Sequence, residues 1–257
     1  MTGKKTRVLL TRLGGVGDLF FLEPVIRTLH EKYAPCEIVF RTYKDYHGVF
    51  DYHPLVSAVV YDSNEYSLGY FNHSLEALRP DLWGNVDSRF DHHFDFQGVI
   101  EKGTERPDYN FHVTNFCGEH AGVFIEDVVP QIHYLKKNVP KYDVVAQLVS
   151  AERHRSLNEN TEILKSLLKY NTYLVPSSKE LGFQEFISII NNCKVFIGTE
   201  SCGSIIARGL NKPIVAFFQT ERRRRALGYD RMRTLMFSEV SKFNNILKET
   251  WDKSKIF

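Results

Sequence analysis

The sequence predicts an α/β protein with two Rossmann-like halves, each built on a parallel sheet, and three observations support this. Short β-branched and leucine-rich runs alternate with amphipathic stretches of helical period. Two of these runs end in glycine-rich turns, at 14–17 and 198–203, that lead directly into helical patterns. The pattern stops in a segment with two prolines, 126–140, and then restarts. A chain of 257 residues is long enough for two small domains.

The first strand and turn organise the N-terminal half. The run VLL at 8–10 is typical of a buried parallel strand, and three glycines, Asp18 and an apolar helical pattern follow it. Ligands bind at the carboxyl edge of such a sheet, so Asp18 is expected at that edge, near a helix start. An aspartate there can equally be a simple helix cap. The glycine spacing does not meet the dinucleotide-binding pattern GxGxxG.

The rest of this half continues the alternation. Strands are expected at 37–41, 58–61 and 93–97, and helices at 73–78 and 112–121. The segment 98–107 is expected to be a loop on the same edge as Asp18, and it carries Lys102.

The C-terminal half repeats the pattern. Strands are expected at 142–149, 172–175, 195–197 and 213–218, and helices at 158–168, 182–191, 203–210 and 241–253. The predicted domains are therefore 1–135 and 141–257, and the last helix can pack back on the N-terminal domain.

The strand at 195–197 passes through Gly-Thr-Glu-Ser-Cys-Gly-Ser directly into a helix. Backbone N–H groups at a helix start, with hydroxyls beside them, form an anion site that suits a phosphate or pyrophosphate. An ordinary capped helix has the same residues. The predicted anion-binding residues are Thr199, Glu200, Ser201, Gly203 and Ser204.

Two arginine groups follow strands of the C-terminal half. Arg153 and Arg155 come after its first strand, from where they can reach a pyrophosphate. The segment 221–233 holds six arginines, and it is expected to be a loop at the carboxyl edge. The four consecutive ones, Arg222, Arg223, Arg224 and Arg225, suit the phosphates of a donor, a lipid headgroup or a nucleic-acid backbone. A solvated loop is the simpler alternative.

Composition and short motifs argue against several classes of protein. The net charge of +2, from 33 basic and 31 acidic residues, does not by itself indicate nucleic-acid binding. The four cysteines form no CxxC pair, which indicates a reducing, cytoplasmic setting. We find no signal peptide and no apolar stretch of spanning length, although association with a membrane surface stays open. His112, Cys117, Glu119 and His120 match no zinc spacing, so no metal is expected. There is no Asp-x-Asp pair and no P-loop.

Three stretches resemble glycosyltransferase family 9, the ADP-heptose:lipopolysaccharide heptosyltransferases. In 7–33, Gly17-Asp18 and Pro24 fall in register with the family's opening pattern. FDFQG at 94–98, which contains Gln97, resembles the end of a family strand, and 193–221 is similar to the second family signature. Within that signature, Glu200 stands for the family's Asp, Cys202 for its Gly and Ile205 for its His.

The resemblance implies a GT-B fold, with two Rossmann-like parallel-sheet domains facing a central cleft. It implies an inverting, metal-independent enzyme that needs no cofactor and in which Asp18 is the general base. The nucleotide-diphosphate sugar would be held mainly by the C-terminal half. Gly17 joins the donor-binding residues through this resemblance, and Gln97 joins Lys102 and the four arginines as acceptor- or phosphate-binding residues. The early Lys/Arg-Trp-Pro segment of the family has no match, and Arg153 or Arg155 can substitute for it.

The expected function is transfer of a sugar to an anionic acceptor. One acceptor is a surface glycan of the lipopolysaccharide-core type, with the enzyme in the cytoplasm or peripheral at the inner membrane. An alternative is a phage-type enzyme in the host cytoplasm that glycosylates a hydroxymethylated DNA base, which must be flipped from the stack. A different class is a non-catalytic nucleotide-sugar-binding module.

Overall fold

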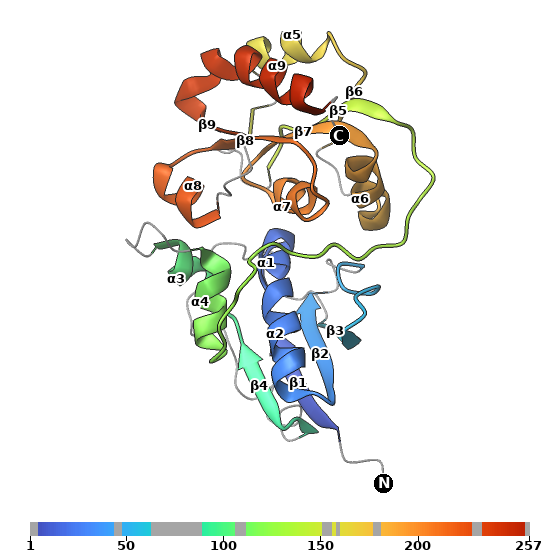
Figure 1. The fold of residues 1–257 in the computed structure, drawn as a ribbon, viewed down its shortest axis with the longest axis vertical. Helices are drawn as coiled ribbons and strands as arrows, with labels where there is room; N and C mark the ends of the chain where they lie inside the picture. The colour runs from blue at the N-terminus through green and yellow to red at the C-terminus, as the bar shows by residue number, and fades with distance from the viewer. Residues whose placement is uncertain are drawn as a thin grey trace. The chain divides into compact units, whose positions relative to one another are not determined.

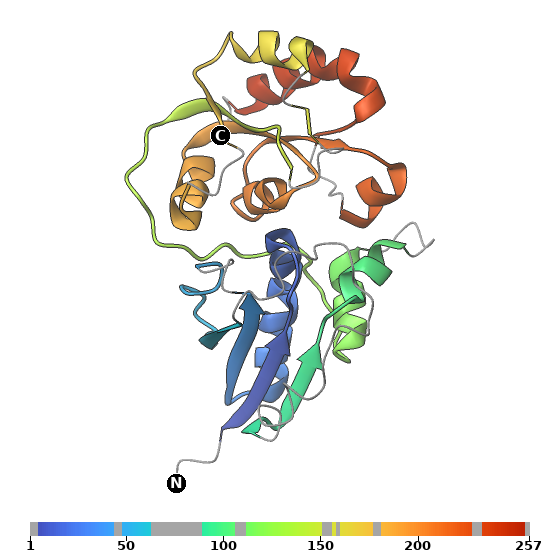
Figure 2. The same cartoon turned by 180° about the vertical axis from the view of Figure 1, so that it is seen from behind.

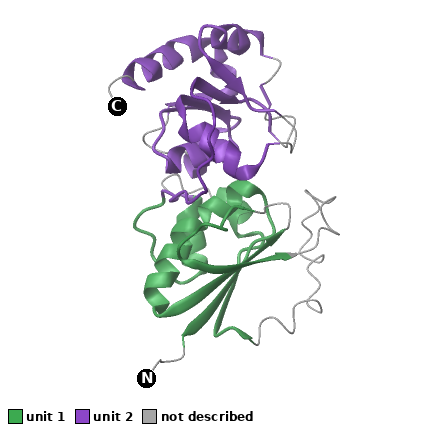
Figure 3. Ribbon diagram, turned by 90° about the vertical axis from the view of Figure 1, so that its right-hand side faces the viewer, with its two compact units in different colours: residues 1–105, 113–128 green, residues 106–112, 129–257 purple. Residues whose placement is uncertain are grey.

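The computed structural model describes residues 5–43, 48–62, 89–105, 112–150, 156–157, 160–176, 181–227 and 233–254. The chain divides into two compact units (Figure 3). The first comprises residues 1–105 and 113–128, and the second comprises 106–112 and 129–257. Residues 123–141, where the chain passes into the second unit, contain no helix or strand.

The first unit contains a four-stranded parallel sheet of order β3-β2-β1-β4 (Figure 1). Its strands are β1 (Thr6–Thr11), β2 (Cys36–Tyr43), β3 (Val56–Asp62) and β4 (His92–Asp95). The central β1 is the buried run that the sequence predicts: Val8, Leu9 and Leu10 are almost inaccessible. Thr11 pairs with Asp95, so β1 and β4 end at the same edge (Figure 2).

The helix expected after the glycine turn is divided in two. Helix α1 (Val16–Phe21) and helix α2 (Glu23–Tyr33) meet at Leu22. Pro24 lies in the first turn of α2, where its missing N–H costs no helical hydrogen bond. Val25, Ile26 and Leu29 on α2 are fully buried.

The prediction of a loop at 98–107 is wrong, because residues 99–105 form helix α3 (Val99–Glu105). Val99 and Ile100 are buried, and Gly103 lies so close to helix α4 (Val113–His120) that a Cβ there would be 2.9 Å from Phe116. The missing side chain of Gly103 therefore permits the close packing of α3 against α4. The helix expected at 73–78 lies outside the described residues.

The second unit contains a five-stranded parallel sheet of order β6-β5-β7-β8-β9. Its strands are β5 (Tyr142–Gln147), β6 (Thr172–Leu174), β7 (Cys193–Thr199), β8 (Ile214–Phe218) and β9 (Arg233–Met236). Sequence reasoning missed β9. This edge strand buries only Leu235, so it lacks a continuous apolar run.

Helices cover both faces of this sheet. Helices α5 (Thr161–Leu167) and α9 (Phe243–Ser254) lie on one face, and α6 (Phe183–Asn191) and α7 (Cys202–Gly209) lie on the other (Figure 1). A 3₁₀ helix, η6 (Phe237–Lys242), leads into α9. Phe243 and Leu247 of α9 join the core with Val195 and Ile197 of β7.

The prediction of a loop at 221–233 is also wrong for residues 221–227, because they form helix α8 (Glu221–Leu227). Glu221 stands in the first turn and pairs with Arg224 at 2.6 Å and with Arg225 at 3.1 Å. Pairs at i,i+3 and i,i+4 spacing stabilise a helix, and arginine is itself a good helix former.

Within the described part of the chain, no helix is both long enough and apolar enough to cross a membrane.

Candidate functional site

Arg12 is the centre of a charged cluster in the first unit. It follows β1 directly, and its side chain is only 1% exposed. Nη1 donates a hydrogen bond to the carbonyl of Phe96 at 3.0 Å, just beyond β4. Nη2 pairs with Asp18 Oδ2 at 2.5 Å and with Glu101 Oε1 at 2.6 Å. One guanidinium therefore holds together the ends of two strands and the starts of α1 and α3.

Asp18 has two roles in this cluster. Oδ2 accepts the N–H of Gly15 at 3.1 Å, which caps α1, and it accepts Arg12 as well. No hydrogen bond from the described residues reaches the other oxygen, Oδ1. The side chain is 26% exposed, so a substrate hydroxyl can approach it. The capping interpretation of the sequence is thus compatible with the chemical one.

The glycine-rich turn is explained by Arg12. A Cβ on Gly14 would lie 2.3 Å from Arg12 Nε, so any larger residue would displace the guanidinium. Burial alone would lower the pKa of Arg12, but Asp18 and Glu101 raise it, and the group stays protonated. On α4, the thiol of Cys117 lies close to the cluster, and burial raises its pKa.

The other site residues predicted in this unit lie near the same edge. Gly17 precedes Asp18 in the first turn of α1. Gln97 follows β4, where its N–H donates to Asp95 Oδ1 at 3.0 Å. Lys102 is exposed on α3, next to Glu101. Sequence reasoning missed Arg12 and Glu101. An arginine directly after a buried strand was a usable signal, whereas Glu101 was assigned to a loop on the same edge as Asp18, without a role in the site.

In the second unit, the start of α7 is capped by a side chain from β5, the strand next to β7. Gln147 ends β5, and its Oε1 accepts the hydroxyl of Ser201 at 2.7 Å and the N–H of Gly203 at 3.2 Å. A Cβ on Gly203 would lie 2.2 Å from that oxygen. A carboxamide oxygen therefore occupies the position where the sequence predicts an anion. Burial raises the pKa of the adjacent Cys202 thiol to about 11.

The side chains of the remaining residues predicted at this site are buried in the protein. Thr199, the last residue of β7, is fully buried. The hydroxyl of Ser204 donates to the carbonyl of Thr199 at 2.8 Å. Glu200 is buried and accepts Arg223 Nη1 at 3.1 Å. Of the predicted set, only Ser201 and Gly203 direct polar groups at the start of α7 in this structure.

The arginines of α8 are less available than the sequence indicates. Arg223 pairs with Glu200, and Arg224 and Arg225 both pair with Glu221. Arg222 is exposed and has no ion-pair partner among the described residues. The four arginines carry four positive charges, and their two ion-pair partners, Glu200 and Glu221, carry two negative ones. Arg153 and Arg155 lie outside the described residues.

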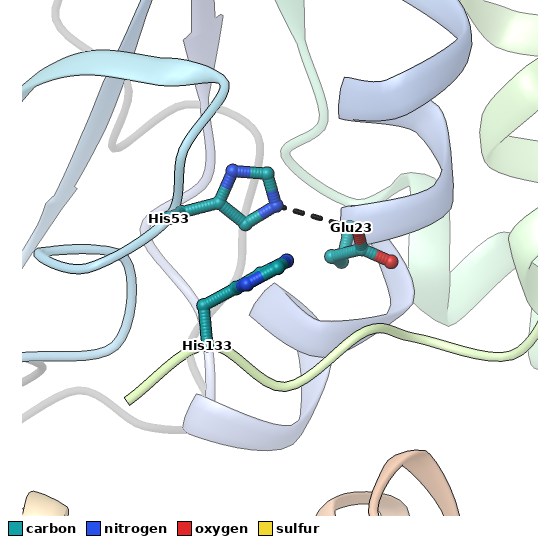
Figure 4. A group of neighbouring side chains, drawn as sticks. All are labelled: Glu23, His53 and His133. Atoms are coloured by element: carbon teal, nitrogen blue, oxygen red, sulfur yellow. Dashed lines mark hydrogen bonds and ion pairs between the residues drawn. The ribbon is translucent and has the colours of Figure 1, made fainter. Parts of the chain in front are cut away.

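A second buried charged group in the first unit involves Glu23 on α2 (Figure 4). His53 Nε2 lies 3.3 Å from Glu23 Oε1, and both side chains are almost fully buried. The N–H of Leu55 donates to His53 Nδ1 at 3.2 Å, which assigns the ring proton to Nε2. Arg27 Nε contacts both carboxylate oxygens, at 3.0 and 3.2 Å. This group ties α2 to the turn before β3, and no sequence pattern indicated it.

The sequence matches no profile of a known protein family and no curated protein. The fold does match solved structures. "E. coli heptosyltransferase WaaC with ADP" aligns with a TM-score of 0.69 and 11% identity, covering 97% of this chain and 100% of that chain. The glycosyl transferase family 9 protein from Veillonella parvula DSM 2008 aligns with a TM-score of 0.62 and 12% identity, covering 97% and 91%. The iron-containing dodecameric glycosyltransferase TibC from enterotoxigenic E. coli H10407 aligns with a TM-score of 0.60 and 14% identity, covering 90% and 62%.

These likenesses place the chain among proteins of the GT-B fold. More narrowly, it has the fold of the glycosyltransferase family 9 heptosyltransferases, which confirms, at the level of the fold, the resemblance seen in the sequence.

Proposed function

We propose that this protein is an inverting glycosyltransferase that moves a sugar from a nucleotide-diphosphate donor to a hydroxyl group. The observation that carries the proposal is the fixed carboxylate of Asp18. One of its oxygens is held by Arg12 and the Gly15 N–H at the carboxyl edge of a parallel sheet. No described residue donates a hydrogen bond to the other oxygen, so it can accept a proton, which is the geometry that a general base needs. The fold shared with glycosyltransferases supports the same reaction class.

The proposed chemistry is a direct displacement. The acceptor oxygen attacks the anomeric carbon, and the bond from that carbon to the diphosphate breaks. The proton of the acceptor hydroxyl passes to Asp18, and the diphosphate leaves with the bonding electron pair. Positive charge and backbone N–H groups stabilise such a leaving group.

We assign the leaving group to the second unit. The start of α7, with Ser201 and Gly203, offers the N–H and hydroxyl donors. Donor binding then requires that the diphosphate replace the oxygen of Gln147 or bind beside it. Thr199, Glu200 and Ser204 act in this proposal by shaping the turn, and Arg153 and Arg155 remain candidates for the phosphates.

The acceptor is proposed from charge. Arg222 and the net positive surface of α8 suit an anionic acceptor, and we favour a lipid-linked or core oligosaccharide of a surface glycan. Such an enzyme works in the cytoplasm, at the inner face of the membrane. Salt-dependent binding to duplex DNA would instead favour the DNA-modifying alternative of phage type. Gln97 and Lys102 are the acceptor-side candidates in the first unit.

One observation favours a second candidate, a non-catalytic nucleotide-sugar-binding module. Gln147 already occupies the start of α7, and Glu200 already pairs with Arg223, so the protein's own side chains satisfy part of the donor site. A module of this kind would bind a donor without turnover. The intact Asp18 cluster favours the enzyme.

A panel of nucleotide sugars and nucleoside diphosphates tests the proposal. We expect one donor and its diphosphate to raise the melting temperature, as any ligand of the native state does. That donor should be hydrolysed or transferred by the wild-type protein and by Asp127→Asn, an exposed control in the same unit. It should be turned over at least a hundredfold more slowly by Asp18→Asn. Binding without turnover would support the module.

Metal independence and the absence of a cofactor are part of the proposal, and the iron in TibC makes them worth testing. Turnover should be unchanged after treatment with EDTA and gel filtration. Loss of activity that returns with one metal ion would refute metal independence.

A further inference from the structure

Glu101 shares its cation with Asp18. Arg12 Nη2 is 2.5 Å from Asp18 Oδ2 and 2.6 Å from Glu101 Oε1, so the two carboxylate oxygens are at most about 5 Å apart. Nη1 also reaches Glu101 Oε2, at 3.2 Å. Glu101 therefore takes two contacts from the guanidinium, whereas Asp18 takes one.

The cluster carries one positive charge and two negative charges. A lone arginine beside an aspartate favours the ionised carboxylate and makes it a weak base. A second carboxylate within a few ångströms opposes this effect, because like charges disfavour each other's ionised form. The other groups that interact with Asp18 are the Gly15 N–H and the thiol of Cys117 on α4, which burial keeps protonated by raising its pKa. Among the described residues, Glu101 is the carboxylate that shares the Arg12 guanidinium with Asp18.

We propose that Glu101 is a positioning residue that keeps Asp18 basic. It shares the Arg12 guanidinium with Asp18 and places a second negative charge beside it. This inference rests on the proposed function, in which Asp18 accepts the acceptor's proton. Glu101 acts through Arg12 and does not touch the reacting atoms. Helix α3, which forms where a loop was expected, therefore holds Glu101 at the position from which it acts on Asp18 through Arg12.

A purely structural role is the alternative, in which Glu101 only anchors α3. The variant Glu101→Gln separates the two, because it keeps the shape and removes the charge. The side chain is 42% exposed, so we expect the variant to fold. Glu105→Gln is the matched control, since Glu105 is an exposed carboxylate on the same helix. Thermal melting checks that both variants are folded.

The first test needs no substrate. Carboxyl ¹³C signals of the full-length protein are followed through an acid titration. In Glu101→Gln, the Asp18 signal should titrate at a lower pH than in the wild type, because a like charge has been removed, and in Glu105→Gln it should not move. An Asp18 signal that titrates at the same pH in all three folded proteins would overturn the inference.

The second test uses the donor and acceptor that the panel identifies. The acidic limb of the kcat/KM profile should move to lower pH in Glu101→Gln by the same amount, and kcat should fall about threefold to tenfold while the KM for the donor stays unchanged. A raised KM with an unmoved pH limb would indicate the structural role. If no donor is turned over, the proposed function fails, and the carbon titration still decides whether Glu101 tunes Asp18.

Discussion

Gln147→Glu should make the protein more stable and at the same time a poorer binder of diphosphates. In the wild type, Gln147 Oε1 accepts one hydroxyl and one backbone N–H at the start of α7. A carboxylate in that position accepts the same two donors and adds a negative charge at the positive end of the helix. The two effects have opposite signs because the donors that stabilise the new charge are those proposed for the phosphates.

The size of the gain follows from the contacts. A charge near a helix N-terminus contributes about 0.3–1 kcal/mol. Each neutral hydrogen bond that becomes charge-assisted adds up to about 1 kcal/mol more. Partial burial of the new charge and repulsion from the nearby Glu200 oppose these terms. We expect a net gain of about 1 kcal/mol, or a rise of about 2–4 °C in melting temperature.

The gain should also depend on pH in a defined direction. Because the fold favours the ionised form, the introduced carboxyl binds its proton less readily in the folded than in the unfolded protein. The extra stability is therefore present at pH values above the pKa of the carboxyl in the unfolded protein, about 4.3, and is lost as the pH falls below that pKa. Urea unfolding of both proteins at pH 7 and pH 4 measures the difference.

Gln184→Glu is the matched control. Gln184 lies in the first turn of α6, and its Oε1 accepts the N–H of Leu135 at 2.7 Å, so the same change there should also stabilise. Titration with nucleoside diphosphates should show at least a tenfold weaker affinity for Gln147→Glu and an unchanged affinity for Gln184→Glu. Unchanged affinity in both would refute the placement of the phosphates at α7, and a destabilised Gln147→Glu would refute the assignment of the cap.

Three further substitutions test the packing at Gly14, the buried charge of Glu23 and the protonation of His112. Gly14→Ala should cost about 1–3 kcal/mol in urea unfolding, because its Cβ would collide with Arg12 at 2.3 Å, whereas Gly182→Ala, with nothing within 4 Å, should change stability by less than about 1 kcal/mol. Glu23→Gln removes the charge from the buried pair in Figure 4 and should cost about 3 kcal/mol by the same measurement; a loss below 1 kcal/mol would show that the pair is dispensable. Burial, and then the nearby arginine charge, lowers the pKa of His112 to about 3, so the wild type should lose about 2 kcal/mol between pH 7 and pH 5 as the unfolded state takes up a proton. His112→Asn should lack this part of the loss, and equal acid sensitivity of the two proteins would contradict the assignment.

Much of the fold was predictable from the sequence because its strands are buried on both faces. Such strands appear as continuous apolar runs, and the runs at 195–197 and 213–218 both lie within or overlap observed strands. The elements that were missed lack this signal. Strand β9 buries one residue, and α3 and α8 are rich in charge. Their helices depend on packing and on side-chain pairs that a short window of sequence does not display.

The site was predictable only in part. Asp18 and the turn after β7 stand out because glycine-rich turns after buried strands are a local pattern. Their partners are far away in the chain: Glu101 is 89 residues from Arg12, and Gln147 is 56 residues from Gly203. Sheet topology brings these residues together, and no local spacing encodes it. The pairing of Glu200 with Arg223 is of the same kind.

The position of α9 has a consequence for how the chain matures during synthesis. The first unit ends at residue 128, so 119 residues (247 minus 128) are translated between its end and Leu247 of α9. At about 5–20 residues per second, that interval is roughly 6–24 s, long enough for the first sheet to form its core. The second unit cannot complete its core within that interval, because Phe243 and Leu247 of its core are made only at the end of it. A ribosome that stalls shortly before α9 would therefore release a chain with one finished unit and one exposed apolar sheet face.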